Sequence, residues 1–460
     1  MKTDFENYQS PFSWRYGSVE MRKLFSEVNR RKTWRKVWVA LAKAQSKFGL
    51  ISKKELEDII KHQNDIDIEK AHQIESEIKH DLMAEVKTYA SQSKIGGGKI
   101  HLGATSQDIE DNADAIIFNL ALELIEKNLK SLLKTWSVKI DQNKDVVCMA
   151  YTHLQPAEPT TLGYRFSLYA QDLLIDLELL NYIKTQIKGK GTKGAVGNYA
   201  SYTSLLGTKS EQMEEEVLKD LGIKAFDVTG QVYPRKLDYL ILCLLSSIAQ
   251  SLYKFAFDLR ILQSAQFGEL AEPFAKKQVG SSAMPFKRNP QNSERICSLA
   301  RYIVSLSRPA WDNAANSLLE RTLDDSAAKR VIVPDSFLAT DEILKLALYI
   351  VSDLVVNKHN IEKNLNSFGP FSALESILLK SVKNGANRQE MHEILREHSM
   401  RVYEEMAKTG ENRLFKNLGN DKAILEYLTK AEIENLTNYK KHIGLSEKKS
   451  KLMISKIKNI

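Results

Sequence analysis

The side chains best suited to acid–base chemistry gather in one short segment, GSSAMPFKRNP (280–290). It holds two adjacent hydroxyls, Ser281 and Ser282, together with the amine of Lys287 and the amide of Asn289. Small residues and two prolines predict a loop, and an asparagine followed by proline fits a helix N-cap and first helical position. A helix N-terminus favours negative charge, so this loop suits an anionic substrate. An ordinary polar loop explains the same residues equally well.

Two other segments resemble ligand sites but lack the necessary context. GKGTKG (189–194) satisfies the dinucleotide pattern GxGxxG, which works only between a strand and a helix. Here it follows a long helical pattern with no βαβ unit around it, so we interpret it as a flexible loop. His392 and His398 stand six positions apart and point to different sides of a helix, unlike a zinc-binding pair. We interpret them as surface helix residues and expect no metal.

The elements that must position the loop are mainly helical. The chain has 460 residues, of which 43% are hydrophobic and 27% charged, as in an ordinary globular protein. Only 10 prolines occur, and three proline-free stretches leave room for long helices: 12–155, 160–233 and 371–460.

Three stripes of apolar residues at helical spacing predict a long-helix bundle. The stripes run from Ile116 to Leu132, from 162 to 180 and from 237 to 259. Further apolar residues beside the third stripe predict that this helix packs on more than one side. The segment NSFGPFSALES (366–376) looks like a boundary. We therefore predict an all-α fold of three domains: N-terminal helical (1–111), central long-helix bundle with the 280–290 loop (112–364) and C-terminal helical (365–460).

Charge and cysteine usage favour a cytoplasmic protein with no nucleic-acid or membrane partner. The formal charge of +8 forms no concentrated basic stripe apart from the C-terminal tail, so we interpret it as surface charge. No apolar run approaches the roughly 18 residues of a membrane span, and MKTDFENYQS lacks the apolar segment of a signal peptide. The three cysteines have no CxxC spacing, which predicts neither a disulfide framework nor a zinc site.

Several segments in order along the chain resemble the fumarase/aspartase superfamily. The superfamily regions are IHLGATSQDIEDN (100–112), YTHLQPAEPTTLG (151–163) and SSAMPFKRNPQNSE (281–294). Other segments resemble the adenylosuccinate lyase family in particular, of its animal-type branch: SPFSWRYGSVEM (10–21), KHD (79–81), TGQVYPRK (229–236) and ERTLDDSAAKR (320–330). We refer to residues 280–290 as the signature loop. Residues 365–460 add little beyond a helical domain.

The resemblance implies a homotetramer of three-domain, mostly helical chains around a twenty-helix core, with each active site shared by three subunits. It implies β-elimination of fumarate from adenylosuccinate, giving AMP, and from its imidazole ribotide counterpart SAICAR, giving AICAR. Both reactions belong to purine nucleotide biosynthesis. No cofactor or metal is expected.

The family pattern assigns catalytic roles residue by residue. Ser281 matches the base that removes the proton beside a carboxylate; from the residues alone, Ser281 and Ser282 are not separable. Lys287 and Asn289 suit stabilisation of the resulting dianion, because one supplies a compact positive charge and the other a directed donor. His153 matches the acid that protonates the departing nitrogen, and Glu294 matches its orienting partner.

Further matched positions imply binding of the substrate and its anionic groups. His80 and His101 match additional active-site histidines, with His80 among the catalytic residues and Asp81 as its orienter. The remaining substrate-binding residues are Arg15, Tyr16, Lys79, Thr105, Ser106, Thr152, Gln231, Ser282, Asn289, Arg295, Arg321, Ser326 and Arg330. Arginine meets phosphate and carboxylate groups with two parallel hydrogen bonds. On a helix, Ser326 and Arg330 share one face.

Two positions depart from the family pattern, and three other functions compete. Lys79 stands where arginine is usual, which weakens a bidentate contact, and Phe286 replaces a histidine or tyrosine. The alternatives are a related lyase acting on argininosuccinate or malate, a catalytically silent helical scaffold, and a nicotinamide-dependent dehydrogenase. The family-specific segments disfavour the first, and the intact catalytic residues disfavour the second. The third rests only on the GxGxxG match.

Overall fold

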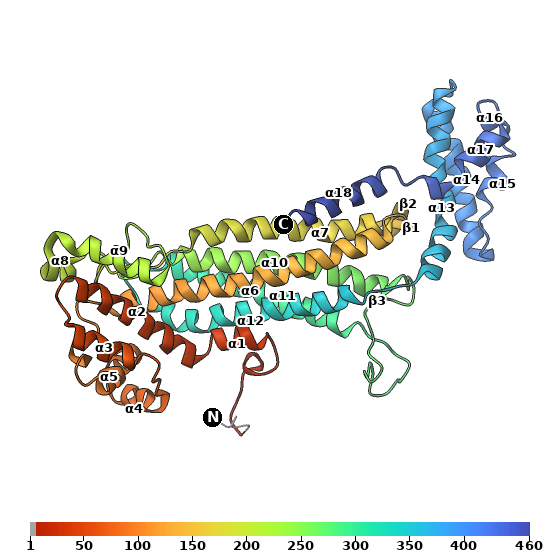
Figure 1. Cartoon of the computed structure of the whole chain (residues 1–460). Helices are drawn as coiled ribbons and strands as arrows, with labels where there is room; N and C mark the ends of the chain where they lie inside the picture. Colours follow the sequence, from red (N-terminus) through yellow and green to blue (C-terminus); the bar gives the residue numbers. More distant parts are fainter. Residues whose placement is uncertain (1–5) are drawn as a thin grey trace. The chain divides into compact units, whose positions relative to one another are not determined.

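The fold is described from a computed structural model over residues 6–460; residues 1–5, part of the N-terminal segment considered for a signal peptide, lie outside the described residues. The predicted all-α class is confirmed (Figure 1). The long helices are α6 (Ser106–Asn143), α7 (Leu162–Gln186), α10 (Lys236–Leu262), α11 (Gln291–Ala315), α12 (Asp324–Ser352) and α13 (Lys358–Lys383).

The chain divides into two compact units, and five long helices contribute residues to both. Unit 1 contains the chain up to Leu129, then Ile175–Leu252 and Cys297–Lys345. Unit 2 contains Lys130–Leu174, Tyr253–Ile296 and Leu346–Ile460. The three predicted domain boundaries remain a prediction.

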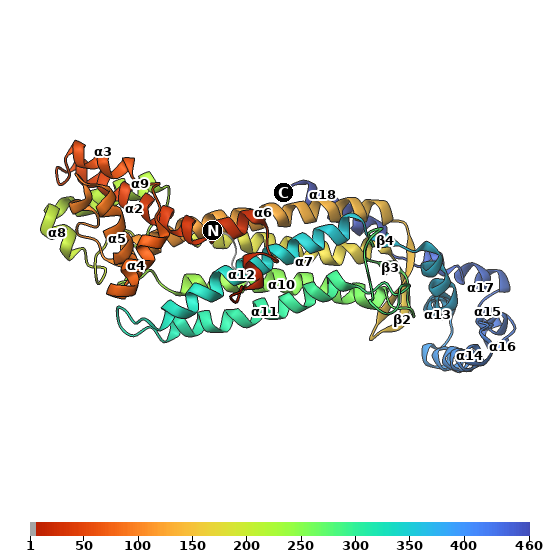
Figure 2. The same ribbon diagram turned by 90° about the horizontal axis from the view of Figure 1, so that it is seen from below.

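Unit 1 has a helical region built from the beginning of the chain and from residues after α7 (Figures 1 and 2). Its core includes Trp38, Leu82, Tyr89, Tyr202 and Val217, all almost fully buried. Ser or Asp side chains cap several of its helices by accepting from the N3 amide. Besides the long helices, the elements of unit 1 are η1 (Pro11–Ser13), α1 (Val19–Leu24), α2 (Glu27–Lys47), α3 (Lys53–Lys61), α4 (Ile68–Ile78), α5 (Asp81–Gln92), η2 (Gly97–Lys99), α8 (Ala200–Leu206), η3 (Gly207–Lys209) and α9 (Ser210–Leu221).

A buried ion triad joins α2 to α5 in this region. Arg31 Nη1 lies 2.8 Å from Glu85 Oε2, and Arg35 Nε lies 2.7 Å from Glu85 Oε1. The Arg35 guanidinium also lies 4.3 Å from the centre of the Tyr89 ring. Because all three charged side chains are almost completely buried, the Glu85 carboxylate is needed to compensate both arginines, and Glu27 Oε1, 2.9 Å from Arg31 Nη2, gives Arg31 a second partner.

Unit 2 adds a hairpin and a C-terminal group of short helices (Figures 1 and 2). Trp136 packs against Phe166 and Phe255, with ring centres 5.2 and 5.0 Å away. Strands β1 (Val147–Thr152) and β2 (Gln155–Thr161) pair antiparallel, as do β3 (Leu270–Ala271) and β4 (Val355–Val356). The other elements are α14 (Arg388–Thr409), α15 (Leu414–Leu418), α16 (Lys422–Leu425), α17 (Lys430–Leu436), η4 (Tyr439–Lys441) and α18 (Ser446–Lys458).

Two details of unit 2 differ from the sequence interpretation. The segment 366–376, interpreted as a boundary, is continuous helix within α13, with Pro370 inside it. Gly369 permits the close approach of Tyr439 to α13, because a Cβ there would lie 2.4 Å from the Tyr439 ring. His398 is buried rather than on the surface, since its Nε2 meets Asp421 Oδ2 at 2.7 Å.

Helix α10 buries apolar residues that lie beside its stripe, while packing on more than one side stays a prediction. In unit 1 its residues Leu237, Ile241, Leu244 and Leu245 are all buried. Helix α10 is also long enough, and the mean hydropathy of part of it high enough, to cross a membrane by length and composition alone. More than half of that part, 56%, is buried within the chain, as in the core helices of soluble proteins, so this is weak evidence for a membrane span.

We predict that Glu85→Gln lowers the free energy of unfolding by about 3–5 kcal/mol, because it leaves the buried Arg35 without a counter-charge and Arg31 with Glu27 alone. Urea-induced unfolding followed by circular dichroism measures this. Glu57→Gln, at an exposed position on α3, is the matched control and should change stability by less than about 0.5 kcal/mol. Equal stability of the two variants would contradict the role given to the triad.

Candidate active site

A pocket in unit 1 collects eight of the predicted site residues. It encloses about 970 Å³, part of it open to solvent. We call it the polar pocket. The predicted residues in its wall are His80, Asp81, Thr105, Ser106, Gln231, Arg321, Ser326 and Arg330. The structure adds Gln107, Glu110, Thr322 and Leu323 to the same wall.

The start of α5 brings His80 and Asp81 to the pocket. His80 is the N-cap residue, and its Nδ1 accepts from the Met83 amide at 3.4 Å. Asp81 Oδ2 accepts from Arg330 Nη2 at 2.5 Å. Burial acts to raise the pKa of Asp81, but the hydrogen bond and charge of Arg330 outweigh it and the pKa is lowered. The neighbouring Lys79 is exposed, outside the pocket wall, and its amine donates to the Ser76 carbonyl.

His101 lies shortly before Thr105 and Ser106 of the polar pocket and is held as a neutral imidazole. Its Nδ1 accepts from the indole of Trp38 at 3.1 Å, which leaves Nε2 as the protonated nitrogen. Burial lowers the pKa of His101 to about 4. At neutral pH the ring is therefore a donor without charge.

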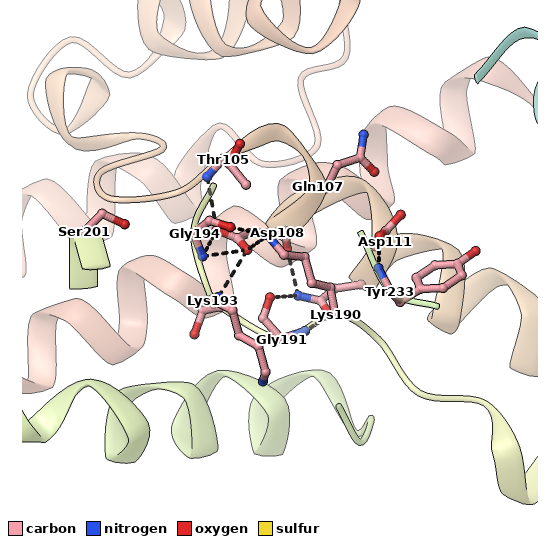
Figure 3. Close-up of polar contacts among 12 residues, drawn as sticks. Thr105, Gln107, Asp108, Asp111, Lys190, Gly191, Lys193, Gly194, Ser201 and Tyr233 are labelled. Carbon is pink, nitrogen blue, oxygen red and sulfur yellow. Dashed lines mark hydrogen bonds and ion pairs between the residues drawn. The ribbon is translucent and has the colours of Figure 1, made fainter. Parts of the chain in front are cut away.

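The carboxylate of Asp108 fixes the turn that presents Thr105 and Ser106 (Figure 3). Its Oδ2 accepts from the Thr105 amide at 3.0 Å, and its Oδ1 accepts from Lys190 Nζ at 2.5 Å. Both Asp108 oxygens also accept from the Gly194 amide at 3.2 Å. The turn is thus tied to the 189–194 segment.

The 189–194 segment is not the flexible loop expected from the sequence. Lys190 and Lys193 are almost fully buried and paired with Asp108 and Glu214. Gly191 has φ +83°, and a Cβ there would lie 2.0 Å from Glu214 Oε1. The glycines therefore allow close packing, and no strand–turn–helix unit surrounds them in residues 6–460. The segment that matches GxGxxG is therefore a buried support for the turn at Thr105.

One face of α12 supplies Ser326 and Arg330, as their spacing predicts. The preceding residue, Asp325, bridges two arginines. Its Oδ1 accepts from Arg321 Nη1 at 2.7 Å, and its Oδ2 accepts from Arg235 Nε at 2.6 Å. Arg235 is buried and also donates to Asp111 Oδ1 at 2.9 Å. Arg321 is therefore oriented through a carboxylate that is itself held in place.

The segment bearing Arg15 and Tyr16 is anchored to a later part of α12. The Gly17 amide donates to Glu342 Oε2 at 3.1 Å, and the Ser18 amide to Asp341 Oδ2 at 2.5 Å. The Arg15 guanidinium lies 5.8 Å from the centre of the Tyr16 ring. Neither side chain is in the wall of the polar pocket.

In unit 2, His153 stands at the tip of the β1–β2 hairpin. Thr152 pairs with Gln155, so His153 and Leu154 form the two-residue turn, with φ of +54° and +60°. Positive φ at both positions is the geometry of a type I′ turn. The His153 side chain is exposed, so the turn presents its imidazole at the surface of the unit.

The signature loop contains no helix or strand, as predicted, and its two ends are held together by a hydrogen bond. Asn289 Nδ2 donates to the Gly280 carbonyl at 2.9 Å. A Cβ on Gly280 would lie 2.2 Å from the Lys287 carbonyl oxygen. Ser281 Oγ accepts from the Met284 amide at 3.0 Å and the Ala283 amide at 3.4 Å. Donors aimed at this oxygen favour negative charge on it, which distinguishes Ser281 from the exposed Ser282.

Helix α11 begins one residue later than expected. Its first residue is Gln291, so Asn289 precedes the cap position. The carbonyl that accepts the first helical hydrogen bond belongs to Pro290, from the Glu294 amide at 2.9 Å. The buried Glu272 caps the free helix end, since its carboxylate accepts from the amides of Asn292 and Ser293 at 3.2 and 2.5 Å. The negative charge expected at this helix N-terminus is therefore supplied by the protein itself.

The remaining predicted residues of unit 2 point to solvent or make few contacts. Lys287 and Glu294 are exposed and Arg295 is half-buried. Within residues 6–460, the side chains of Lys287, Glu294, Arg295 and His153 make no hydrogen bond or ion pair, so the predicted pair of His153 and Glu294 is not formed within one chain. Phe286 is 82% exposed.

Comparison with known proteins identifies the family. The Lyase family matches residues 16–305, and the family described as adenylosuccinate lyase C-terminus matches residues 370–450. The adenylosuccinate lyase of Schistosoma mansoni is 41% identical over 91% of this chain and 88% of its own length. The chain belongs to the adenylosuccinate lyase family. The enzymes of that name from Saccharomyces cerevisiae (41% identity, 91% of this chain and 88% of theirs) and Methanocaldococcus jannaschii (38%, 98% and 96%) agree.

Solved structures of more distant proteins share the fold of this adenylosuccinate lyase family member. Fumarate lyase from Mesorhizobium sp. BNC1 has a TM-score of 0.86 at 23% identity, covering 98% of this chain and 99% of its own. The 3-carboxy-cis,cis-muconate lactonizing enzyme from Pseudomonas putida has a TM-score of 0.87 at 22% identity, with coverage of 98% and 99%. The family match to residues 370–450 also shows that the C-terminal region carries family information beyond a helical domain.

Three predicted site residues of this family member adopt a left-handed backbone. Among residues 6–460, the non-glycine residues with positive φ are six, and Lys79, His101 and His153 are three of them. Such conformations cost about 1–3 kcal/mol each and persist where the surrounding structure fixes them, often at functional sites. The backbone thus supports these positions independently of the sequence motifs.

One cluster of possible metal ligands occurs among residues 6–460, and none of its members is a predicted site residue. Glu158, Glu375 and His442 place their ligand atoms within 4.8 Å of one another. The two carboxylates are exposed, and exposed acidic groups commonly come together without an ion.

Sequence reasoning missed several residues that line or support the polar pocket. Gln107 and Glu110 lie inside the IHLGATSQDIEDN motif, and Asp325 lies inside ERTLDDSAAKR. A signal was present, since Glu110 follows Ser106 by one helical turn and shares its face. The buried partners Lys190 and Arg235 had no such signal, because only the fold reveals which lysines and arginines are buried.

We predict that stability depends on His101 below neutral pH. Because the folded-state pKa is lowered from 6.5 to about 4, the stabilisation is fully present above pH 6.5 and is lost as pH falls toward 4. The largest loss is about 3 kcal/mol in the free energy of unfolding. His101→Asn keeps a residue that tolerates positive φ and should remove this part of the pH dependence. Urea unfolding between these pH values measures it.

The control is His72→Asn, at an exposed histidine on α4. It should retain the pH dependence of the unmodified protein. Identical pH profiles for the His101→Asn variant and the unmodified protein would show that His101 is not held neutral by the fold.

Proposed function

We propose that the protein is an adenylosuccinate lyase that eliminates fumarate from adenylosuccinate, giving AMP, and from SAICAR, giving AICAR. Three relatives, 38–41% identical over at least 91% of this chain, carry the name adenylosuccinate lyase. The observation that carries the proposal is the polar pocket, where Arg321, Ser326 and Arg330 meet His80, Thr105, Ser106 and Gln231. No cofactor or metal takes part in the proposed reaction.

The polar pocket suits the anionic groups of such substrates. Arg321 and Arg330 each hold one carboxylate of the protein and retain further N–H donors for a ligand. The hydroxyls of Ser326, Thr105 and Ser106 add neutral donors in the same wall. We assign Arg15, Tyr16, Lys79, Thr152, Ser282 and Arg295 to further substrate contacts, as the family motifs imply.

The reaction breaks a C–N bond in two steps. Ser281 Oγ acts as an alkoxide, which Lys287 and the Ala283 and Met284 amides favour, and it takes the proton from the carbon beside a succinyl carboxylate to become a hydroxyl. The electron pair left on that carbon is stabilised as a dianion by Lys287 and Asn289. The electron pair then forms the C=C bond of fumarate as the C–N bond breaks. The departing nitrogen receives a proton from the imidazole of His153, which Glu294 orients. His80, with Asp81 behind it, binds the substrate beside the reacting carbon.

We further propose a cytoplasmic homotetramer in which each site is shared between subunits. The exposed positions of His153, Lys287 and Glu294 support this, because side chains without partners in the described part of their own chain are available to another copy. Helix α7 also exposes Leu168, Ile175 and Tyr182, apolar side chains that a neighbouring copy would cover.

The activity is tested by following the ultraviolet absorbance of adenylosuccinate with the purified protein. We predict that Ser281→Ala and His153→Ala each reduce turnover by at least about 100-fold while substrate binding survives, as expected for loss of an acid–base group. Ser305→Ala and His359→Ala, both at exposed positions outside the predicted site, are the controls and should keep normal turnover. Near-normal turnover of a site variant removes that residue from its role.

Sharing of the site is tested by mixing two inactive variants. If His153 and Lys287 of one site come from different chains, His153→Ala and Lys287→Ala subunits repair each other in mixed oligomers. With random mixing in equal amounts, about one quarter of the sites regain both side chains in a closed homo-oligomer. The measurement is turnover after joint unfolding and refolding, beside each variant refolded alone. Efficient reassembly without regained activity would contradict shared sites.

A further inference from the structure

Glu110 stands where two pockets of unit 1 meet. The polar pocket lies on one side. The second, which we call the inner pocket, encloses about 740 Å³, part of it open to solvent, and its wall includes the apolar residues Phe25, Trp34 and Phe118. The residues that line both pockets are Gln107, Glu110, Arg321, Ser326 and Arg330. Glu110 is the one carboxylate that the structure describes in this shared wall.

The hydrogen bonds around Glu110 determine which of its oxygens is available. Gln107 Oε1 accepts from Arg235 Nη2 at 3.4 Å, and Gln107 Nε2 donates to Glu110 Oε2 at 2.5 Å. Since a guanidinium only donates, the amide oxygen of Gln107 must face Arg235 and its NH₂ group must face Glu110. Oε2 is therefore an acceptor in either charge state. Within residues 6–460, Oε1 has no hydrogen-bond partner and carries the proton when the group is neutral.

The cations near Glu110 already have other carboxylate partners. Arg330 pairs with Asp81, and Lys329 lies 2.6 Å from Asp114. The titratable and charged groups that line the same pockets or act on Glu110 are Arg30 of α2, His80 at the N-cap of α5, Asp81 of α5, Asp111 and Asp114 of α6, Arg235 just before α10, Arg321, and Asp325, Lys329 and Arg330 of α12.

This environment makes the charge of Glu110 variable near neutrality. Burial, followed by the charges of Asp81 and Asp114, raises the pKa of Glu110 to about 7, against the opposing effect of Arg330. Below that pH the side chain is a carboxylic acid with a donor on Oε1. Above it, a carboxylate stands in the wall that holds Ser326 and Arg330.

We propose that Glu110 contacts the anionic group of a nucleoside monophosphate in the polar pocket, donating to it from Oε1 when protonated and repelling it when ionised. The charge of Glu110 then sets the pH range in which the site binds nucleotide tightly. This assignment rests on the proposed function, because it takes the polar pocket as the place of the nucleotide. Glu110 is a binding residue in this scheme and takes no part in bond breaking.

The test is the affinity for AMP, measured by calorimetry at about pH 6, 7 and 8.5 and constant ionic strength, in the unmodified protein and in Glu110→Gln. Glutamine imitates the protonated acid, since its oxygen still accepts from Gln107 and its NH₂ group still donates. We expect the affinity of the unmodified protein to fall about ten-fold relative to Glu110→Gln as pH rises through 7. Titration of the phosphate of AMP takes place in both measurements, so the ratio of the two affinities reports the charge of Glu110.

The control is Glu27→Gln. Glu27 acts on the charge of Arg330 but lines neither pocket, so this variant should keep the pH dependence of the unmodified protein. Parallel affinity profiles for Glu110→Gln and the unmodified protein overturn the assignment, as does a lack of AMP binding by both. Turnover of adenylosuccinate is measured separately. Absent turnover with the expected AMP profiles overturns the proposed function alone, and normal turnover with parallel profiles overturns the Glu110 assignment alone.

Discussion

The guanidinium of Arg235 is buried in unit 1 and donates to side chains of α6 and α12. A buried charge is tolerated only when it is paired, so Asp111 and Asp325 must take up fixed positions around it. These fixed positions in turn hold residues of the pocket wall. Asp325 also accepts from Arg321, and Gln107, which accepts from Arg235, donates to Glu110. A planar guanidinium can serve these partners at once, whereas a lysine offers a single point of charge. Two residues in the wall of the polar pocket, Arg321 and Glu110, therefore depend on this one cation.

Helix type and order could be predicted from the sequence because long apolar stripes at helical spacing have few other solutions. The β1–β2 hairpin could not. Its turn residues are His153 and Leu154 rather than the glycine or asparagine that announce a type I′ turn. The cap of α11 was equally hidden, since Glu272 lies far along the chain from the amides it binds. The pattern of the segment 366–376 suggests a boundary, yet α13 continues through it.

For the candidate site, motifs located residues that a pocket gathers, but not their chemical state. Matching ERTLDDSAAKR predicted Ser326 and Arg330 on one face, which the structure confirms. It could not predict that Arg330 is held by Asp81, or that Trp38 keeps His101 neutral. Those properties arise from burial and from neighbours distant in sequence. Left-handed backbone at Lys79, His101 and His153 likewise emerges only in three dimensions.

The ion pairs of the polar pocket also determine at which stage of synthesis and folding the pocket can form. Asp81 and Arg330 are 249 residues apart, and Arg235 and Asp325 are 90 apart. A chain emerging from the ribosome presents Asp81 and Arg235 long before α12 supplies their partners. Closing such long loops costs entropy that is recovered only when the last element is in place. A polypeptide interrupted before residue 330 therefore carries half of an anion site and no pocket to contain it.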